Sequence, residues 1–519
     1  MENTIFGLNI YGLLINLFFL AIIGSVTILK SFNIETGADY FLAEKKGKWL
    51  TLGISLFITI LSSEFFFYIL LLKMSLGFSL FTVIAASLLA VGFNIAVLVP
   101  RFLASPVITI TQLIEERIKG KYVNWITKFL IFLATFIKLA LIIYISGLLF
   151  QDILKIDMIS CLLFIIFFTG VYTLVGGLET VASLQIIQTA GAVITLIYFA
   201  LFGRDIFEIN NFLLSFRNSF QKSSAVFYNA EISQLSVFIF LLLLAIWFWG
   251  FDQKIYQRVI SASGFRPAVR TYALSFIFFI FTVIILTGHF FSDSIYLNYN
   301  VLMSPQERHI LPFENGILMM GIFSWLMSSL SAAFHGIASQ VTFDIYKRYN
   351  PETSQQKLIL IARLTLTVLI LAAILLVPMI KLANLGFFIN AFGFLLVLIL
   401  PLLAVFICAF LFNRISARGV LAGYLLGAVL VGLKILFSKF EYLKEYLSGL
   451  YFVLTNLNFS NLALLLFLIT CSFIIILTLW ENKGEKAFFT EITSRLKSSL
   501  KERDNEPDLK ARKIYKQIL

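Results

Sequence analysis

Long apolar runs separated by short polar segments make up most of the chain. A helix needs about 20 mostly apolar residues to cross the hydrocarbon core of a bilayer. Runs of that length have the approximate bounds 8–30, 49–72, 75–100, 123–150, 156–175, 184–203, 234–253, 270–291, 313–340, 358–380, 382–412, 417–437 and 459–480. The pattern predicts an all-α membrane protein with about 13 transmembrane helices and a charged tail over 481–519. The segment 106–121 is too polar to span, and we expect it to lie along the cytoplasmic interface as an amphipathic stretch.

Composition supports a membrane protein. Of the 519 residues, 60% are hydrophobic and only 13% are charged. A soluble protein of this length needs far more charge to cover its surface, so lipid must cover this one. The three cysteines, Cys161, Cys408 and Cys471, lie in apolar runs at spacings that match no zinc or disulfide pattern. We interpret them as packing residues.

The net charge of +12 carries information about topology. With the N-terminus outside, the cytoplasmic segments before the tail hold 18 Lys and Arg residues and the outer segments hold 10. Because Lys and Arg gather in cytoplasmic loops, this split predicts an outside N-terminus and a cytoplasmic C-terminus. We expect a multi-pass protein of the cell's inner (plasma) membrane that functions as a monomer in the lipid bilayer and binds no nucleic acid.

The motifs that are missing narrow the function. The sequence contains no His-Glu-x-x-His, no Gly-Lys-Ser/Thr loop and no Ser/His/Asp order, so neither an enzyme nor a nucleotide-driven pump is expected. A helical bundle without such a site is typical of a transporter or a channel, and no pore loop or ring of charge favours a channel. The energy for transport must then come from an ion gradient or from the gradient of the solute.

Three ionisable residues fall in or near the predicted spans, where charge is costly and therefore often functional. Glu64 and Lys138 lie near the middle of their helices, and Asp252 follows Gly250. Asp252 is alternatively close enough to the cytoplasmic end to be solvated. Glu64 and Lys138 alternatively belong to a structural ion pair, because either charge buried alone requires a partner.

Ser328 and Ser329 stand in an apolar helix, where serines usually bond their own i−4 carbonyls or allow helices to pack closely. Ser331, Ser339 and Thr342 follow on the same helix. Two hydroxyls can also complete the oxygen shell of a sodium ion that unwound backbone carbonyls begin. The pair is therefore a candidate for sodium binding.

Over about residues 8–480 the chain resembles the sodium:solute symporters, which include sodium/glucose, sodium/proline and sodium/pantothenate transporters. Six motifs in the right order carry the resemblance: 38–43 (ADYFLA), 111–121 (TQLIEERIKGK), 176–188 (GGLETV…Q), 248–258 (FWGFDQ…QR), 328–329 (SS) and 343–348 (FDIYKR). Singly these motifs are weak, but their common order on thirteen spans is specific.

The resemblance implies a core of five plus five helices in an inverted repeat over 31–412, with one extra helix at 1–30 and two at 413–480. Helices 49–72 and 234–253 would be interrupted at the midplane. It also implies a sodium site made of the carbonyls of Ile58, Leu61 and Trp325 and the hydroxyls of Ser328 and Ser329. The solute would lie near Ser62, Glu64, Phe65, Trp249 and Asp252. The expected function is sodium-coupled uptake of a small polar solute by alternating access.

The chain departs from the family pattern at several positions. Gln185 stands where the family usually has a carboxylate that supports the sodium site, which puts the sodium affinity in doubt. Phe65 and Asp252 replace a Gln and an Asn of the sugar-transporting members. Lys138 has no counterpart, and it is a candidate tethered cation near Glu64 or Asp252, or a partner for an anionic solute. A sodium-independent carrier, a carrier coupled to protons through Glu64, and a non-transporting membrane sensor remain alternatives.

Overall fold

The computed structural model describes residues 10–31, 37–42, 47–61, 80–105, 107–118, 120–153, 157–202, 234–290, 312–382, 385–412, 414–439 and 459–481. In these ranges the chain is almost entirely helical, and its only β structure consists of two isolated bridges, Gly47 with Ala262 and Ile118 with Ile415. The candidate solute residues Ser62, Glu64 and Phe65 lie outside the described residues.

Each of the thirteen predicted spans falls on a helix of the described ranges. The uninterrupted ones are α1 (Ile10–Ser31), α8 (Lys121–Leu148), α13 (Phe265–Phe290), α15 (Pro312–Gln340), α17 (Gln355–Leu382), α18 (Leu385–Leu411), α19 (Ala417–Lys439) and α22 (Phe459–Glu481). The span 75–100 becomes α5 (Leu80–Phe93), a π-helical turn η2 (Asn94–Leu98) and α6 (Val99–Ala104). All of these are long and apolar enough to cross a membrane. The expected fold class is confirmed.

Two predicted spans join in α9 (Met158–Phe202), which is broken at Gly177. Gly177 has φ 58°, a left-handed conformation that favours glycine because it has no Cβ. The hydroxyl of Tyr172 accepts a hydrogen bond of 3.0 Å from Gln188 Nε2, 16 residues further along. A straight helix would separate these residues by about 24 Å, so the two halves of α9 fold back on each other. Each half is one span.

The helices of two other predicted spans end or bend within the described residues. Helix α3 (Trp49–Ile60) has 12 residues, about 18 Å of helix, and cannot cross the bilayer alone. Helix α11 (Gln234–Ile246) continues through the π-helical turn η6 (Trp247–Phe251) and then bends by 51° into α12 (Gln253–Ile260). Four spans separate these two interrupted helices in the described chain, which is the spacing that a repeat of five requires.

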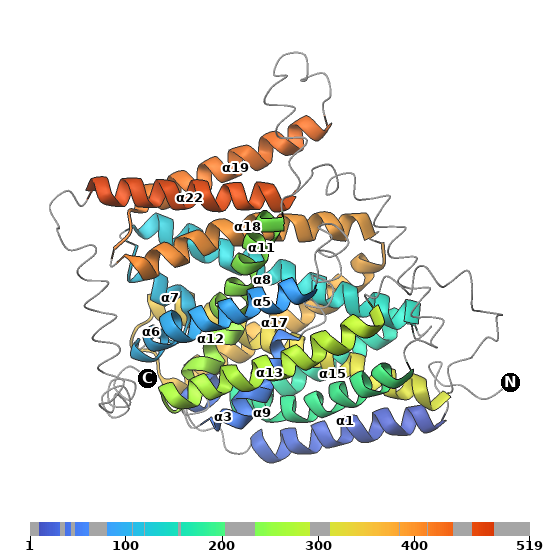
Figure 1. Cartoon of the computed structure of the whole chain (residues 1–519). Helices are drawn as coiled ribbons and strands as arrows, with labels where there is room; N and C mark the ends of the chain where they lie inside the picture. The colour runs from blue at the N-terminus through green and yellow to red at the C-terminus, as the bar shows by residue number, and fades with distance from the viewer. Residues whose placement is uncertain are drawn as a thin grey trace, which may run out of the picture.

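The helices lie side by side in layers, with α1 at one edge of the bundle and α19 and α22 at the opposite edge (Figure 1). Helix α15 is the central element, since 89% of its span is buried inside the protein, against 28% for α1 and α19. Helices α3, α5, α11, α12 and α13 form one group of contacting helices, and α8, α9, α15 and α17 form a second, with α3 contacting α9 and α15 across the two. The candidate sodium residues are thus carried by helices of both groups.

The polar segment 106–121 does not form a long amphipathic helix. Its short helix α7 (Ile110–Glu115) begins with a capping box, in which the side chains of Thr109 and Gln112 bond each other's backbone N–H groups. Ile110 and Leu113 are buried, and Gln253 Oε1 of α12 accepts from Ile110 N at 2.9 Å. The segment is therefore packed into one end of the bundle.

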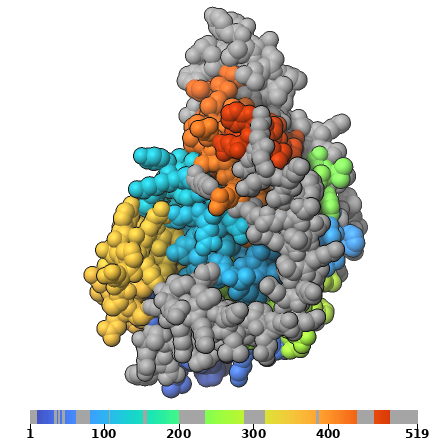
Figure 2. All heavy atoms as spheres, turned by 90° about the vertical axis from the view of Figure 1, so that its left-hand side faces the viewer, coloured from blue at the N-terminus to red at the C-terminus, as the bar shows by residue number. Residues whose placement is uncertain are grey.

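On the face shown in Figure 2, the cyan atoms of α8 lie between the yellow atoms of α17 and the orange atoms of α19.

Candidate ion and solute site

The candidate sodium ligands lie on two contacting helices, α3 and α15, and are here called the α3–α15 site (Ile58, Leu61, Trp325, Ser328 and Ser329). Ile58 and Leu61 pack in a buried apolar cluster at the end of α3, and Trp325 of α15 packs against the same cluster. Leu61 follows the last residue of α3. Because the last carbonyls of a helix lack partners within it, those of Ile58 and Leu61 are suitable cation ligands.

Ser328 and Ser329 are completely buried in the bundle. The hydroxyl of Ser329 donates to the carbonyl of Trp325 at 2.8 Å, the ordinary i−4 bond of a helical serine. The hydroxyl of Ser328 accepts a hydrogen bond of 2.9 Å from Gln185 Nε2. Neither oxygen faces lipid, so both have the burial that an ion site requires.

Gln185 connects four helices. Its Nε2 donates to Thr59 Oγ1 of α3 at 3.1 Å and to Ser328 Oγ of α15. Its Oε1 accepts from Ser55 Oγ of α3 and, at 2.8 Å, from a guanidinium nitrogen of Arg258 on α12. From the sequence, Gln185 was notable only because it stands where the family usually has a carboxylate. Its role in joining α3, α9, α12 and α15 comes from the structure.

Arg258 was not a predicted site residue, although it lies in the 248–258 motif. Its side chain is 1% exposed and lies next to the α3–α15 site. The guanidinium donates to Ser55 Oγ at 2.8 Å, to Gln185 Oε1 at 2.8 Å and to the carbonyl of Lys254 at 2.5 Å. All of these acceptors are neutral.

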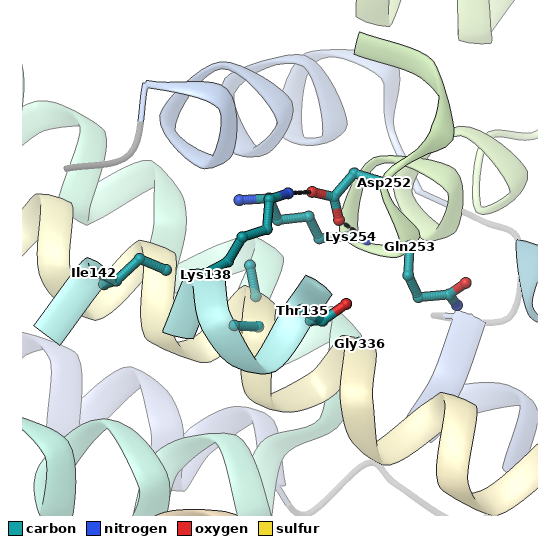
Figure 3. Close-up of a pocket in the computed structure, with 9 residues that line it drawn as sticks. Thr135, Lys138, Ile142, Asp252, Gln253, Lys254 and Gly336 are labelled. Carbon is teal, nitrogen blue, oxygen red and sulfur yellow. Dashed lines mark hydrogen bonds and ion pairs between the residues drawn. The ribbon is translucent and has the colours of Figure 1, made fainter. Parts of the chain in front are cut away.

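Lys138 and Asp252 form a buried ion pair, in which the Lys138 ammonium donates to Oδ2 of Asp252. Figure 3 shows Lys138 reaching from α8 toward Asp252 at the beginning of α12. Asp252 also caps α12 by accepting from Lys254 N at 3.2 Å, and the Lys138 ammonium lies 4.8 Å from the centre of the Phe248 ring. The pair joins the two groups of helices. Asp252 is therefore buried and paired rather than solvated.

This ion pair lines a small pocket between α8, α12 and α15, here called the Lys138 pocket (Figure 3). Its lining mixes charged, amide and hydroxyl groups with small apolar ones: Thr135, Lys138, Ile142, Asp252, Gln253, Lys254, Ala332, Ala333 and Gly336. Such a combination suits a small polar ligand. The pocket and the α3–α15 site are connected through α12, which carries Asp252 at its start and Arg258 near its end.

Trp249, another predicted solute residue, lies apart from the pocket. Its side chain is 1% exposed and packs edge-on against Phe276 and Phe279 of α13. Its carbonyl accepts from the Tyr272 hydroxyl at 2.9 Å. The structure thus brings Lys138 and Asp252 together and links Ser328 to Thr59 of α3 through Gln185, while Trp249 of η6 packs against α13.

Comparison with known proteins identifies this arrangement. The sequence model of the sodium:solute symporter family matches residues 40–427. The chain belongs to the sodium:solute symporter family. The expected resemblance is confirmed, and the symporter carries out sodium-coupled secondary transport of a small-molecule solute, not an enzymatic reaction.

Individual relatives cover nearly all of this symporter. It is 24% identical to a sodium/glucose cotransporter of Vibrio parahaemolyticus, over 89% of this chain and 92% of the relative. It is also 24% identical to the sodium/myo-inositol cotransporter 2 of Mus musculus, over 79% of this chain and 67% of the relative. A solved Na⁺-coupled sialic acid symporter, substrate-bound and outward-open, superposes with a TM-score of 0.69 at 18% identity, covering 91% of this chain and 98% of that one. That likeness shows the fold.

Proposed function

We propose that this symporter takes up a small polar solute together with sodium, and that the ion binds at the α3–α15 site. The carbonyls of Ile58, Leu61 and Trp325 and the hydroxyls of Ser328 and Ser329 would supply its ligands. The observation that carries the proposal is that α3 ends at the level of Ser328, to which Gln185 links it through Thr59. A hard cation prefers oxygen ligands of this kind.

The solute would bind in the Lys138 pocket and in the space next to it. Lys138 and Asp252 offer a donor and an acceptor there, and Thr135 and Gln253 add a hydroxyl and an amide. Ser62, Glu64 and Phe65, which follow the end of α3 in sequence, complete the proposed solute site. Glucose, myo-inositol and sialic acid, which the relatives' names specify, are all small and polar. Trp249, which lies apart from the pocket, would support the site only through the packing of η6 against α13.

Coupling follows from the position of the ion. Sodium at the α3–α15 site would join a helix of the first group to a helix of the second, and so stabilise one of the alternating states. A coupling free energy of about 1–3 kcal/mol between ion and solute is typical of linked sites. A membrane potential of 100 mV supplies about 2.3 kcal/mol per sodium charge.

The remaining expectations fit this mechanism. Both sites are formed within one chain, which supports a functional monomer. The positive-inside split places the N-terminus outside, the C-terminus and tail in the cytoplasm, and the end of the bundle with α7 on the cytoplasmic side. The core over 31–412 would carry transport, with α1, α19 and α22 as flanking helices.

Uptake by the purified protein in liposomes, with equal inward gradients of sodium or potassium, tests the proposal. The double variant Ser328→Ala/Ser329→Ala is expected to lose sodium stimulation while it keeps the melting temperature of the wild type to within a few degrees. Ser324→Ala is the matched control, because the Ser324 hydroxyl is buried on the same helix and, within the described residues, bonds the Met320 carbonyl. Undiminished sodium stimulation in the double variant would show that the ion binds elsewhere.

A further inference from the structure

The α3–α15 site has a symmetry-related counterpart in the fold. Helix α3 is the first span of the first repeat and α8 is the third, while α11 with η6 and α12 is the first span of the second repeat and α15 is the third. Inverted repeats are related by a pseudo-two-fold axis in the membrane plane. The place where α3 meets α15 therefore corresponds to the place where the interrupted helix α11–α12 meets α8.

The ion pair of Lys138 with Asp252 stands at this counterpart. Leu61 is the residue that caps the C-terminus of α3, and Asp252 is the residue that caps η6 at the break before α12. On the facing helices, Ser329 lies 17 residues after the start of α15 and Lys138 lies 17 residues after the start of α8. The ion pair thus joins the positions that correspond to Leu61 and Ser329.

Both places favour a cation for the same physical reason. The last carbonyls of a helix have no partners within it and form the negative end of the helix dipole. In the first repeat that end is at Leu61, where we propose that sodium binds. In the second repeat it is at η6, where the Lys138 ammonium donates to Asp252 and lies 4.8 Å from the centre of the Phe248 ring (Figure 3).

We propose that Lys138 is a built-in cation, whose ammonium permanently fills the position that an exchangeable sodium ion takes in the symmetry-related site. This inference rests on the proposed function, because the α3–α15 site defines the counterpart. The two related positions then bind one exchangeable sodium ion instead of two. It follows that Asp252 without the ammonium is a sodium site, since Thr135 and Gln253 supply further oxygens in the same pocket.

Replacing the ammonium tests the proposal. Lys138→Ser gives α8 the hydroxyl that Ser329 gives α15, and it leaves the carboxylate of Asp252 in place. The change is made in the Ser328→Ala/Ser329→Ala variant, so that the α3–α15 site does not contribute. We expect this triple variant to melt several degrees higher in sodium chloride than in potassium chloride of equal ionic strength, because an ion that binds the native state stabilises it. The parent double variant should melt at the same temperature in both salts.

Two matched variants in the same background serve as controls. Lys138→Arg keeps a tethered cation, and Lys138→Ser/Asp252→Asn lacks the carboxylate, so neither should distinguish sodium from potassium. A sodium effect of the same size in either control would overturn the proposal. So would the absence of a sodium effect with Lys138→Ser, which is the result expected if Lys254 takes the place of Lys138. Lys254 also lines the pocket and acts electrostatically on Asp252.

A second substitution covers the case in which Lys138→Ser does not fold. Lys138→Gln removes the charge but keeps an amide that can donate to Asp252, and it should show the same preference for sodium. If neither variant folds in either salt, sodium does not replace the ammonium and the inference is wrong. If sodium stabilises the Ser328→Ala/Ser329→Ala parent as strongly as the wild type, the α3–α15 site itself is refuted, which is a failure of the proposed function.

Discussion

The ammonium of Lys138 and the carboxylate of Asp252, 114 residues apart in the sequence, meet in the interior of the bundle where α12 begins. Their side chains are 7% and 8% exposed. The pair joins α8 of one helix group to α12 of the other.

Removing either partner of this pair should be more damaging than removing both. Lys138→Met leaves a buried carboxylate and Asp252→Asn leaves a buried ammonium, and each should cost about 3–5 kcal/mol of folding free energy. The double variant Lys138→Met/Asp252→Asn carries no orphan charge, so it should recover much of the stability. Melting temperatures in detergent measure this. Additive losses in the double variant would show that the two charges are not coupled.

The double variant also separates stability from transport. Because it lacks both charges of the Lys138–Asp252 pair in the Lys138 pocket, we expect it to fold but to lose at least nine-tenths of sodium-driven uptake. Wild-type uptake by a well-folded double variant would exclude the pocket from the solute path.

Gly177 should tolerate no side chain. It has φ 58°, and a Cβ there would lie 2.9 Å from the carbonyl oxygen of Tyr40. Strain of this kind costs about 1–3 kcal/mol, so Gly177→Ala should lower the melting temperature by several degrees. Gly432→Ala is the control, because nothing lies within 4 Å of a Cβ at that position of α19. Equal melting temperatures for the two variants would contradict the hairpin geometry of α9.

Asp344 should hold the α7 segment against the end of α15. Its two carboxylate oxygens accept hydrogen bonds from the hydroxyls of Thr109 and Thr111. Hydrogen bonds to a buried charge contribute about 1.5–3 kcal/mol each. Asp344→Ala should therefore destabilise the protein and expose the segment 107–118 to protease. Glu352→Ala, at an exposed position nearby, should do neither. A protease-resistant Asp344→Ala variant would show that other contacts hold this segment.

The ion pair of Lys30 with Glu179 should contribute little, although its nitrogen and oxygen are 2.9 Å apart. The two side chains are 40% and 50% exposed, and exposed pairs contribute about 0–1 kcal/mol. Lys30→Ala is expected to change the melting temperature by less than two degrees. A larger loss would mean that the pair fixes α1 to the turn between the halves of α9.

The sequence by itself determined the spans and their order, because a run of about 20 apolar residues has one low-energy arrangement in a bilayer, whatever its neighbours. All thirteen predicted spans fall on described helices, and the motif around Asp252 marked the second interrupted helix. The serines of α15 were also recognisable, since two adjacent hydroxyls in an apolar run are visible in the sequence alone.

Only the tertiary structure decided which polar groups meet. Glu64 and Asp252 were both candidate partners of Lys138; the structure brings Lys138 of α8 to Asp252 at the start of α12, and Glu64 lies outside the described residues. Gln185 and Arg258 are both buried, yet their contact depends on how the second half of α9 is rotated against α12. Trp249 contacts α13 for the same reason. Hydrophobicity is a local property of a segment, whereas the partner of a buried charge depends on the rotation and depth of two helices far apart in the chain.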